Sequence, residues 1–356
     1  MKTVTVAAIY DRRRRSETAA TEQAVELLRK GEIVALPTET VYGLAADALN
    51  SIAVAKIFEA KERPRFDPLI VHLPNCDCLE KIADLPARDR QLILKLADNF
   101  WPGPFTMVLP KREIVPEIVT SGLYTVAVRI SAHPIFADII SAFAGPLAAP
   151  SANRFGRISP TTAQHVFEEL KGRIPLIVDA GPTTHGIEST IVAIHRGNID
   201  ILRRGPITAE QLSEFGKVRI VASARTISAP GQLPSHYAPK TPLRLIDNSK
   251  SFLSKKNQRI GLLAWHPMSR KGDLQIAQRR TRDRRSLRFV AVRQLSESQD
   301  LREAAANLFR YLRELDQSGV DLIVAERVPL QGLGTAIMDR LQCAAHDRRS
   351  EQDRPE

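Results

Sequence analysis

The chain has 356 residues, of which 43% are hydrophobic, 26% are charged and only 5% are aromatic. This length and balance are typical of a globular protein with two domains, or with one large domain, and an aliphatic core. Apolar runs such as Ile191–Ile194 are far shorter than the ~20 residues of a membrane-spanning helix, which excludes the membrane-spanning class.

The N-terminus and the cysteines both indicate a cytoplasmic protein. The opening sequence MKTVTVAAIYDRRRR lacks the order of basic region, apolar region and cleavage site that marks a signal peptide. Cys76 and Cys78 are too close together for a CxxC knuckle, and Cys343 stands alone. We therefore expect reduced thiols and no structural zinc site.

The net charge of +11 is large enough to attract polyanions such as nucleic acids or nucleotides. Much of the surplus lies in two arginine clusters, Arg12–Arg15 and Arg279–Arg288. Neither cluster has interleaved aromatic residues, so we interpret both first as solvated surface and only second as phosphate contacts. Simple solubility also explains the charge.

The first two hundred residues alternate between helical and strand patterns. Asn50 is placed to cap a helix that Pro64 stops, and His133-Pro134 opens another helix. Ser159 before Pro160 is typical of a helix N-cap. Further helices are expected at 21–30 and 88–100, and strands at 33–36, 69–73, 105–109 and 126–130. These patterns predict a mixed α/β domain at 15–208.

A proline-punctuated stretch without periodicity separates this domain from a second one. We assign 209–242 to a linker or functional loop, because it is too long for an ordinary connection. Strand patterns at 261–265, 289–292 and 320–324 and a helix at 301–315 then predict a smaller, doubly wound α/β domain with parallel strands over 243–345. Residues 346–356 are expected to be a disordered tail.

The common nucleotide-binding signatures are missing. The chain has no GxxxxGK[ST] run, and Gly332-Leu333-Gly334 lacks the third glycine of the dinucleotide fingerprint. If the protein handles ATP, it uses neither a Walker loop nor a conventional dinucleotide fold.

Four other segments carry groups suited to chemistry. They are PTETVYGL at 37–44, KERPRFDPLIVH at 61–72, APSAN at 149–153 with SPTT at 159–162, and HGIEST at 185–190 with LRRG at 202–205. Each has an ordinary structural interpretation: a polar turn, cations at a helix end, a core histidine, a helix cap. Taken singly they favour no function.

Read in order, these segments resemble the L-threonylcarbamoyl-adenylate synthase family. The resemblance extends to FWPGPFTMVLP, TVAVRISAHP and ILRRGPIT in the first domain, and to SHYAPKTP and EAAANLFRYLRELDQSGVDLIVAERVPLQGLGTAIMDRL beyond it. It covers about residues 20–345 and implies the two-domain type, with a twisted mixed sheet whose concave face is basic and a C-terminal Rossmann-like domain.

The resemblance also implies the site. L-Threonine should be held by five residues, with Arg129 clamping its carboxylate: Thr40, His72, Arg129, Ala149 and Ser189. ATP should be held by Lys61, Arg63, Asp67, Thr125, Ser151, Asn153, Ser159, Arg203, His236 and Tyr237. Lys61 and Arg63 are the expected catalytic cations, and His236 and Tyr237 belong to the linker that folds over the nucleotide.

The implied reaction joins L-threonine, bicarbonate or CO2, and ATP into L-threonylcarbamoyl-AMP with release of pyrophosphate. Mg²⁺ is expected to accompany ATP and share the phosphate charge. The product would supply the N6-threonylcarbamoyladenosine modification of tRNA, so the expected partners are tRNA, or double-stranded RNA more generally, and a threonylcarbamoyl-transferase machinery, with no membrane. No covalent nucleophile is assigned.

Four residues of the first domain depart from the family's usual pattern, and the linker before His236 is altered at Gln232, Leu233 and Pro234. Glu62 stands for a glycine and could partly neutralise Lys61 and Arg63, Asp67 stands for an asparagine, Phe155 for a serine and Arg204 for a proline. Two other functions stay open: a non-catalytic RNA-binding protein on the same scaffold, and a related enzyme that uses carbamoyl phosphate. The latter ranks last, because no acylphosphatase or zinc-finger module is visible.

Overall fold

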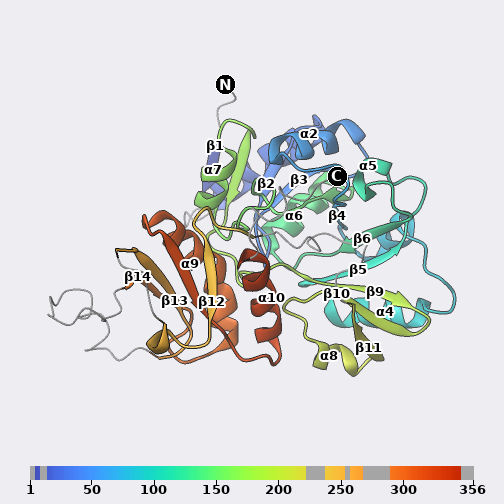
Figure 1. The fold of residues 1–356 in the computed structure, drawn as a ribbon. Coiled ribbons are helices and arrows are strands. Elements are labelled where there is room, and N and C mark those ends of the chain that lie inside the picture. Colours follow the sequence, from blue (N-terminus) through green and yellow to red (C-terminus); the bar gives the residue numbers. More distant parts are fainter. Residues whose placement is uncertain (1–4, 9–13, 222–236, 253–256, 268–288, 346–356) are drawn as a thin grey trace, which may run out of the picture. The chain divides into compact units, whose positions relative to one another are not determined.

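The computed structural model divides the chain into two compact units (Figure 1). The first comprises Met1–Phe155 and Ser159–Leu233, and the second comprises Gly156–Ile158 and Pro234–Glu356. The structure describes residues 5–8, 14–221, 237–252, 257–267 and 289–345. The predicted tail and most of the two arginine clusters lie outside these residues.

Within the described residues, eleven strands of the first unit form one mixed sheet. Its strand order is β1-β8-β2-β3-β7-β4-β6-β5-β9-β10-β11. The strands are β1 (Thr5–Ala8), β2 (Val34–Leu36), β3 (Gly43–Asp47), β4 (Ile70–His72), β5 (Phe105–Pro110), β6 (Thr125–Arg129), β7 (Leu147–Ala148), β8 (Leu176–Asp179), β9 (Thr190–His195), β10 (Asn198–Arg203) and β11 (Lys217–Ile220). Parallel and antiparallel pairs both occur, so the mixed α/β prediction is confirmed.

The helices of the first unit include those expected after Asn50, at 88–100 and after His133, together with several that were not predicted. They are α1 (Arg14–Arg29), α2 (Ser51–Lys61), α3 (Leu79–Ile82), α4 (Arg90–Phe100), α5 (Glu117–Thr120), α6 (Pro134–Phe143), α7 (Ala163–Leu170) and α8 (Ala209–Ser213), with a 3₁₀ turn η1 (Cys76–Cys78). Asn50 caps α2 as predicted, since its side chain accepts the N–H groups of Ile52 and Ala53.

Two predicted helix starts are wrong. The helix expected at 21–30 is α1, which already begins at Arg14. Ser159 does not cap a helix with Pro160 as its first residue; α7 begins at Ala163, and its N-cap is Thr162, whose hydroxyl accepts the His165 N–H. The Ser159 hydroxyl instead donates to Glu188, which lies far away in the sequence. A local capping pattern was outweighed by a tertiary hydrogen bond.

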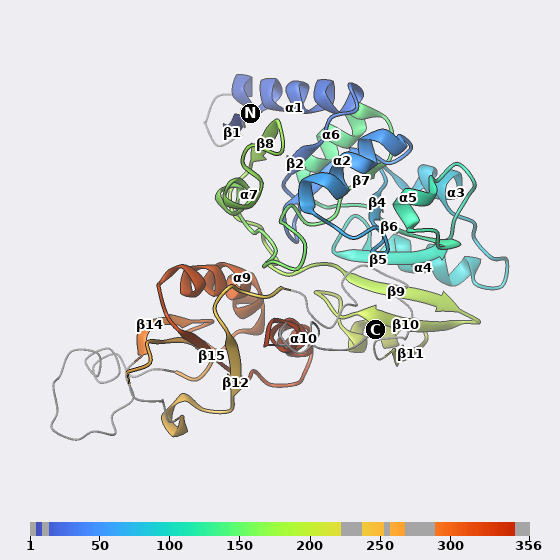
Figure 2. The ribbon, with the colours of Figure 1, turned by 45° about the horizontal axis from the view of Figure 1, so that its top comes forward.

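Both faces of the sheet are buried near β2. Ile33 and Ala35 belong to the large core that includes α2, whereas Val34 and Leu36 belong to a second core that includes α1 and α6. Successive residues of a strand point to opposite faces, so this short apolar run serves both cores. Helices α1 and α6 pack against each other over the second core (Figure 2).

The linker predicted at 209–242 starts too early. Residues 209–220 form α8 and β11, and β11 pairs in parallel with β10 at the edge of the large sheet. The helix is short and the strand carries two charged residues, Lys217 and Arg219, so neither gave a periodic signal. Residues 222–236 lie outside the described part of the chain.

Within the described residues, the second unit contains a four-stranded parallel sheet of order β12-β15-β13-β14. Its elements are β12 (Leu243–Ile246), a 3₁₀ turn η2 (Ser249–Ser251), β13 (Ile260–Ala264), β14 (Phe289–Gln294), α9 (Leu301–Gln317), β15 (Leu322–Glu326) and α10 (Leu333–Ala345). The parallel arrangement was predicted, whereas strand β12 was not. Gly334 is needed for packing, because an added Cβ would lie 2.0 Å from the Pro329 carbonyl oxygen.

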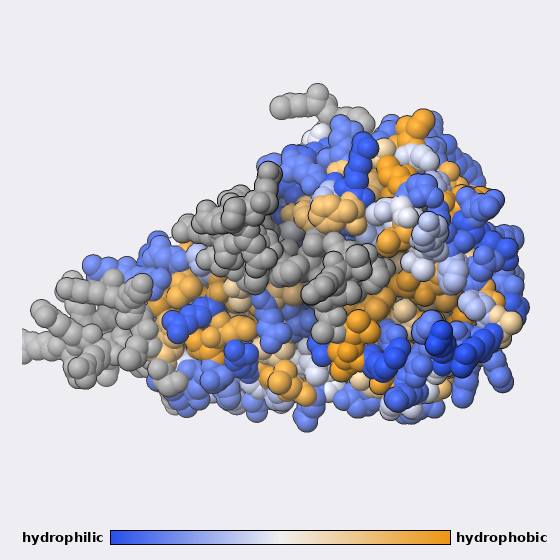
Figure 3. All heavy atoms as spheres, turned by 45° about the vertical axis from the view of Figure 1, so that its right-hand side comes forward, coloured by the Kyte–Doolittle hydropathy of each residue, from blue (hydrophilic) through white to orange (hydrophobic). Residues whose placement is uncertain are grey.

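The surface shown in Figure 3 is mostly hydrophilic, with separate apolar patches. Among the described residues, no helix combines the length and the hydropathy that crossing a membrane requires.

Candidate active site

Four central strands of the first unit present one face on which polar side chains gather. A small apolar cluster on this face takes one residue from each strand: Ile70, Val108, Ala127 and Ile191. Their sequence neighbours point the other way into the large core: Val71, Met107, Val128 and Val192. His72 and Arg129 lie two residues beyond Ile70 and Ala127, so strand alternation puts both on the face of the cluster.

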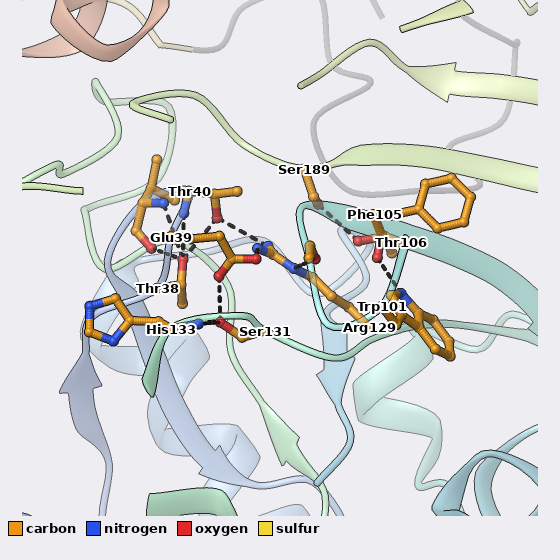
Figure 4. A network of polar contacts seen from close by, with 12 residues as sticks. Thr38, Glu39, Thr40, Trp101, Phe105, Thr106, Arg129, Ser131, His133 and Ser189 are labelled. Atoms are coloured by element: carbon orange, nitrogen blue, oxygen red, sulfur yellow. Dashed lines mark hydrogen bonds and ion pairs between the residues drawn. The ribbon is translucent and has the colours of Figure 1, made fainter. Parts of the chain in front are cut away.

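Arg129 is the centre of a buried polar network (Figure 4). Its Nε donates to the Gly103 carbonyl at 3.1 Å, Nη1 to the Thr40 hydroxyl at 3.0 Å, and Nη2 to the Glu39 carboxylate at 2.6 Å. A guanidinium has five N–H groups. Two are therefore left over after these three bonds, enough to bind a further carboxylate.

Glu39 is the counter-ion of Arg129. One carboxylate oxygen accepts from Arg129, and the other accepts from the Ser131 hydroxyl at 2.5 Å (Figure 4). Burial acts to raise the pKa of Glu39, but the Arg129 charge and these hydrogen bonds outweigh it and bring the pKa to about 2. Glu39 is thus a carboxylate at any physiological pH.

His72 lies beside this network as a neutral imidazole. Burial lowers the pKa of His72 to about 3, and the Arg129 charge acts in the same direction. The ring contacts Phe136 of α6 at a centroid distance of 4.7 Å. Its Nδ1 is buried and makes no hydrogen bond within the described part of the chain.

Ser189 is held by a second arginine, Arg203. Its hydroxyl is 2.8 Å from that of Thr106 and accepts from Arg203 Nη2 at 3.1 Å. Nε and Nη2 of Arg203 also donate to the Ser189 carbonyl. Both residues are buried, at 0% and 7% exposure, so Arg203 is fixed where β10 ends beside the start of β9.

A second buried cluster lies at the end of α2. Lys61 Nζ donates to the carbonyls of Ser151 and Asn153, and Arg63 pairs with the Asp67 carboxylate at 2.8 Å. Burial and the Arg63 charge lower the pKa of Lys61 well below its usual value. Burial raises the pKa of Asp67, against the charges of Arg63, Lys61 and Arg203. That coupling links Arg203 to this cluster.

The remaining predicted residues border these groups. Ala149 is held by a backbone bond from its N–H to Ile70, and Ser151 forms a β-bridge with Gly43 beside the PTET turn. Asn153 is buried next to the Lys61 amine, and half-buried Thr125 begins β6. Ser159 is bonded to Glu188, next to Ser189 in the sequence.

Comparison with known proteins identifies the chain's relatives. A family model described as telomere recombination matches residues 26–205, and a model described as the C-terminal domain of threonylcarbamoyl-AMP synthase matches residues 207–346. A threonylcarbamoyl-AMP synthase of Pyrococcus abyssi is 39% identical over 90% of this chain and 93% of its own length. The chain belongs to the threonylcarbamoyl-AMP synthase family.

Two further matches support this assignment. The Bacillus subtilis threonylcarbamoyl-AMP synthase is 39% identical over 92% of this chain and 93% of its own length. A crystal structure described as P. abyssi Sua5 complexed with L-threonine has a TM-score of 0.82 and 36% identity, and covers 96% of this chain and 97% of that chain. The expected family and the two-domain architecture are both confirmed.

The departures from the threonylcarbamoyl-AMP synthase pattern can now be placed. Glu62 does not neutralise Lys61, because its exposed carboxylate pairs with Arg173 at 2.6 Å. Its backbone is left-handed, with φ 53°, which explains why glycine suits this position. Asp67 forms an ion pair with Arg63 through one oxygen. Phe155 donates its N–H to the Lys61 carbonyl, and half-buried Arg204 follows β10.

The two linker residues predicted to cover ATP have different outcomes. His236 lies outside the described residues. Tyr237 is buried in the second unit, where its ring stacks on Phe309 at 5.3 Å and Arg340 lies over it at 5.4 Å. A role for Tyr237 at the nucleotide stays a prediction.

Sequence reasoning missed several residues of the network, above all Glu39, Ser131 and Thr106. The sequence does contain a signal for Glu39. An acid that directly follows a buried strand is expected to be buried too, and a buried carboxylate needs a cation as its partner. Ser131 and Thr106 had none, because a hydroxyl at a strand end is common.

Proposed function

We propose that this chain synthesises L-threonylcarbamoyl-AMP from L-threonine, bicarbonate or CO2, and ATP, with release of pyrophosphate, for the threonylcarbamoyladenosine modification of tRNA. One observation carries the proposal beyond family membership: buried Arg203 is bonded to Ser189, a residue expected to hold threonine, and is close enough to the Lys61 cluster for its charge to act on Asp67. We place the reaction in the cytoplasm, where ATP and tRNA are found.

The Arg129 network forms the amino-acid subsite in this proposal. The two remaining N–H groups of Arg129 bind the threonine carboxylate as a fork. The neutral His72 imidazole accepts a hydrogen bond from an N–H or O–H group of the substrate. Its Nδ1 is buried and has no other partner in the described chain. Thr40, Ser189 and the Ala149 backbone complete the subsite.

The Lys61 cluster forms the nucleotide subsite. Lys61, Arg63 and Arg203 supply positive charge to the phosphates from a buried setting, where the attraction is stronger than in water. Thr125, Ser151, Asn153 and Ser159 border the bound nucleotide, and a contact of His236 and Tyr237 with it stays a prediction.

Mg²⁺ fits these residues as a companion of ATP. Among the described residues, no three His, Cys, Asp or Glu side chains are grouped to hold a metal by themselves. Asp67 offers one buried oxygen, Oδ1, that makes no hydrogen bond in the described chain. One carboxylate beside phosphate oxygens and water is a common setting for Mg²⁺. When bound, the ion withdraws charge from the phosphates.

The chemistry follows from bringing the two subsites together. The threonine amine, after losing a proton, adds to CO2, and loss of a second proton leaves a carbamate. A carbamate oxygen attacks the α-phosphorus, and the bond to the pyrophosphate oxygen breaks. Lys61 and Arg63 stabilise the charge that develops on the α-phosphate and on the leaving pyrophosphate.

Replacing Arg129 with Ala tests the assignment of the amino-acid subsite. We expect threonine-dependent pyrophosphate release to fall at least about a hundredfold, because the carboxylate loses a bidentate, buried partner. Mass spectrometry should detect threonylcarbamoyl-AMP for the wild type after incubation with ATP, threonine, bicarbonate and Mg²⁺, and not for the variant.

Nucleotide binding by the variant is the control, since Lys61, Arg63 and Arg203 are unchanged. Turnover at the wild-type level in Arg129→Ala would contradict the assignment. Salt-sensitive RNA binding by a wild type that forms no threonylcarbamoyl-AMP would favour the non-catalytic alternative instead.

A further inference from the structure

We propose that Glu39 is a specificity-determining residue: by neutralising Arg129, it keeps phosphate groups out of the amino-acid subsite. The inference rests on the proposed function, because it assumes that Arg129 binds the threonine carboxylate. It explains how the protein could distinguish threonine from ATP, although each presents an anionic group to it, a carboxylate or a phosphate.

Glu39 is fixed in a single orientation. Its carboxylate is bound on both oxygens, by Arg129 and by Ser131, and its own carbonyl accepts the His185 N–H at 2.8 Å. Its neighbour Thr40 accepts from the same guanidinium. The negative charge therefore cannot swing away when a ligand enters, and the residue is only 7% exposed to screening by solvent.

The two subsites differ in net charge. Arg129 and Glu39 sum to zero, and His72 and His133 add nothing near neutral pH because burial lowers the pKa of both. In the other subsite, Arg63 and Arg203 act on the Asp67 carboxylate, and Lys61 adds a third positive charge once bound phosphate favours its protonated form. With Lys61 protonated, the three cations exceed the two acids Asp67 and Glu188, and Glu169, which also acts on Lys61, is paired with Arg154.

Each net charge matches one substrate. Threonine is a zwitterion with no net charge, so a neutral ion pair with two spare N–H groups suits it. A guanidinium fork binds phosphate as readily as carboxylate. Without Glu39, Arg129 would be an uncompensated buried cation, and phosphate or the pyrophosphate product would compete with threonine for it.

Threonine binding measured by calorimetry with and without inorganic phosphate tests the idea. In the wild type, phosphate should leave the threonine Kd nearly unchanged. In Glu39→Gln, which keeps the shape and removes the charge, phosphate should raise the threonine Kd about tenfold, as expected for losing one close charge interaction. Glu39→Asp keeps the negative charge, so phosphate should again leave the threonine Kd nearly unchanged.

Asp89→Asn is the matched control, because Asp89 is another buried acid, bonded to the backbone N–H groups of Arg196 and Gly197. It should show the wild-type response to phosphate. A merely structural role for Glu39 would weaken threonine binding equally with and without phosphate, which would overturn the inference.

The wild type alone also decides, should Glu39→Gln fail to fold. Competition between phosphate and threonine in the wild type would overturn the inference. If the wild type binds no threonine at all, the proposed function fails instead, so the two failures are distinguishable.

Discussion

Lys61 is an ionisable group held where its charge is unfavourable until a ligand arrives. Its side chain is 1% exposed, and its amine contacts only carbonyl oxygens among the hydrogen bonds described above. Burial and the neighbouring Arg63 both lower the pKa of Lys61. A polyphosphate bound nearby would act in the opposite direction and favour the protonated amine.

We therefore expect ATP binding to be coupled to proton uptake by Lys61. Calorimetric titrations with ATP in buffers of different ionisation enthalpy, between about pH 7 and 10, measure the protons taken up. The uptake should vanish in Lys61→Gln, while a residual ATP affinity from Arg63 and Arg203 remains. The same uptake in the variant would show that another group is responsible.

At the level of elements, the turn after β10 depends on a close approach of two backbones. A Cβ added at Gly205 would lie 2.4 Å from the Thr190 nitrogen and 2.7 Å from the Glu188 oxygen. Both are backbone atoms at the start of β9, so neither can rotate aside. The glycine lets Arg203 reach the Ser189 carbonyl.

Gly205→Ala should consequently separate β10 from the segment Glu188–Thr190. We expect a loss of about 1–3 kcal/mol in the free energy of unfolding, typical of overpacking, and a marked fall in threonine-dependent pyrophosphate release. Gly216→Ala is the matched control, since its nearest contact is an ordinary 3.5 Å. Thermal unfolding and the activity assay together check both effects; equal behaviour of the two variants would contradict the explanation.

At the level of the whole molecule, the buried site makes the first unit sensitive to acid. The pKa of His72 is about 3 in the folded chain against 6.5 in an unfolded one. The unfolded state therefore binds this proton first, and stability falls as the pH drops from about 6.5 towards 3. Glu39 acts in the same direction below about pH 4.5, because its folded pKa is about 2.

Urea unfolding at about pH 7 and pH 5 measures the effect of His72. Trp101 reports on the first unit if Trp265 of the second unit is replaced with Phe in all proteins compared. We expect roughly 2 kcal/mol of stability to be lost between these pH values through His72, at 1.36 kcal/mol per pKa unit. His72→Asn should lack this part of the loss; an unchanged pH dependence would show that His72 is not the group responsible.

The sequence by itself determined the elements with strong local signals and the family. These signals act through neighbours in the chain. Asn50 predicted the start of α2, Gly31 predicted the end of α1, and a short apolar run predicted β2. The ordered motifs likewise led to the family that the comparisons confirmed.

Only the tertiary structure decided how the polar side chains are paired. Ser159 has a capping pattern yet donates to Glu188, Glu62 turns to Arg173 rather than to Lys61, and Glu39 takes Arg129 and Ser131 as partners. These pairs are separated by 29 to 111 residues. Buried polar groups must be satisfied wherever the fold brings partners together, and no local pattern encodes which distant residue that is.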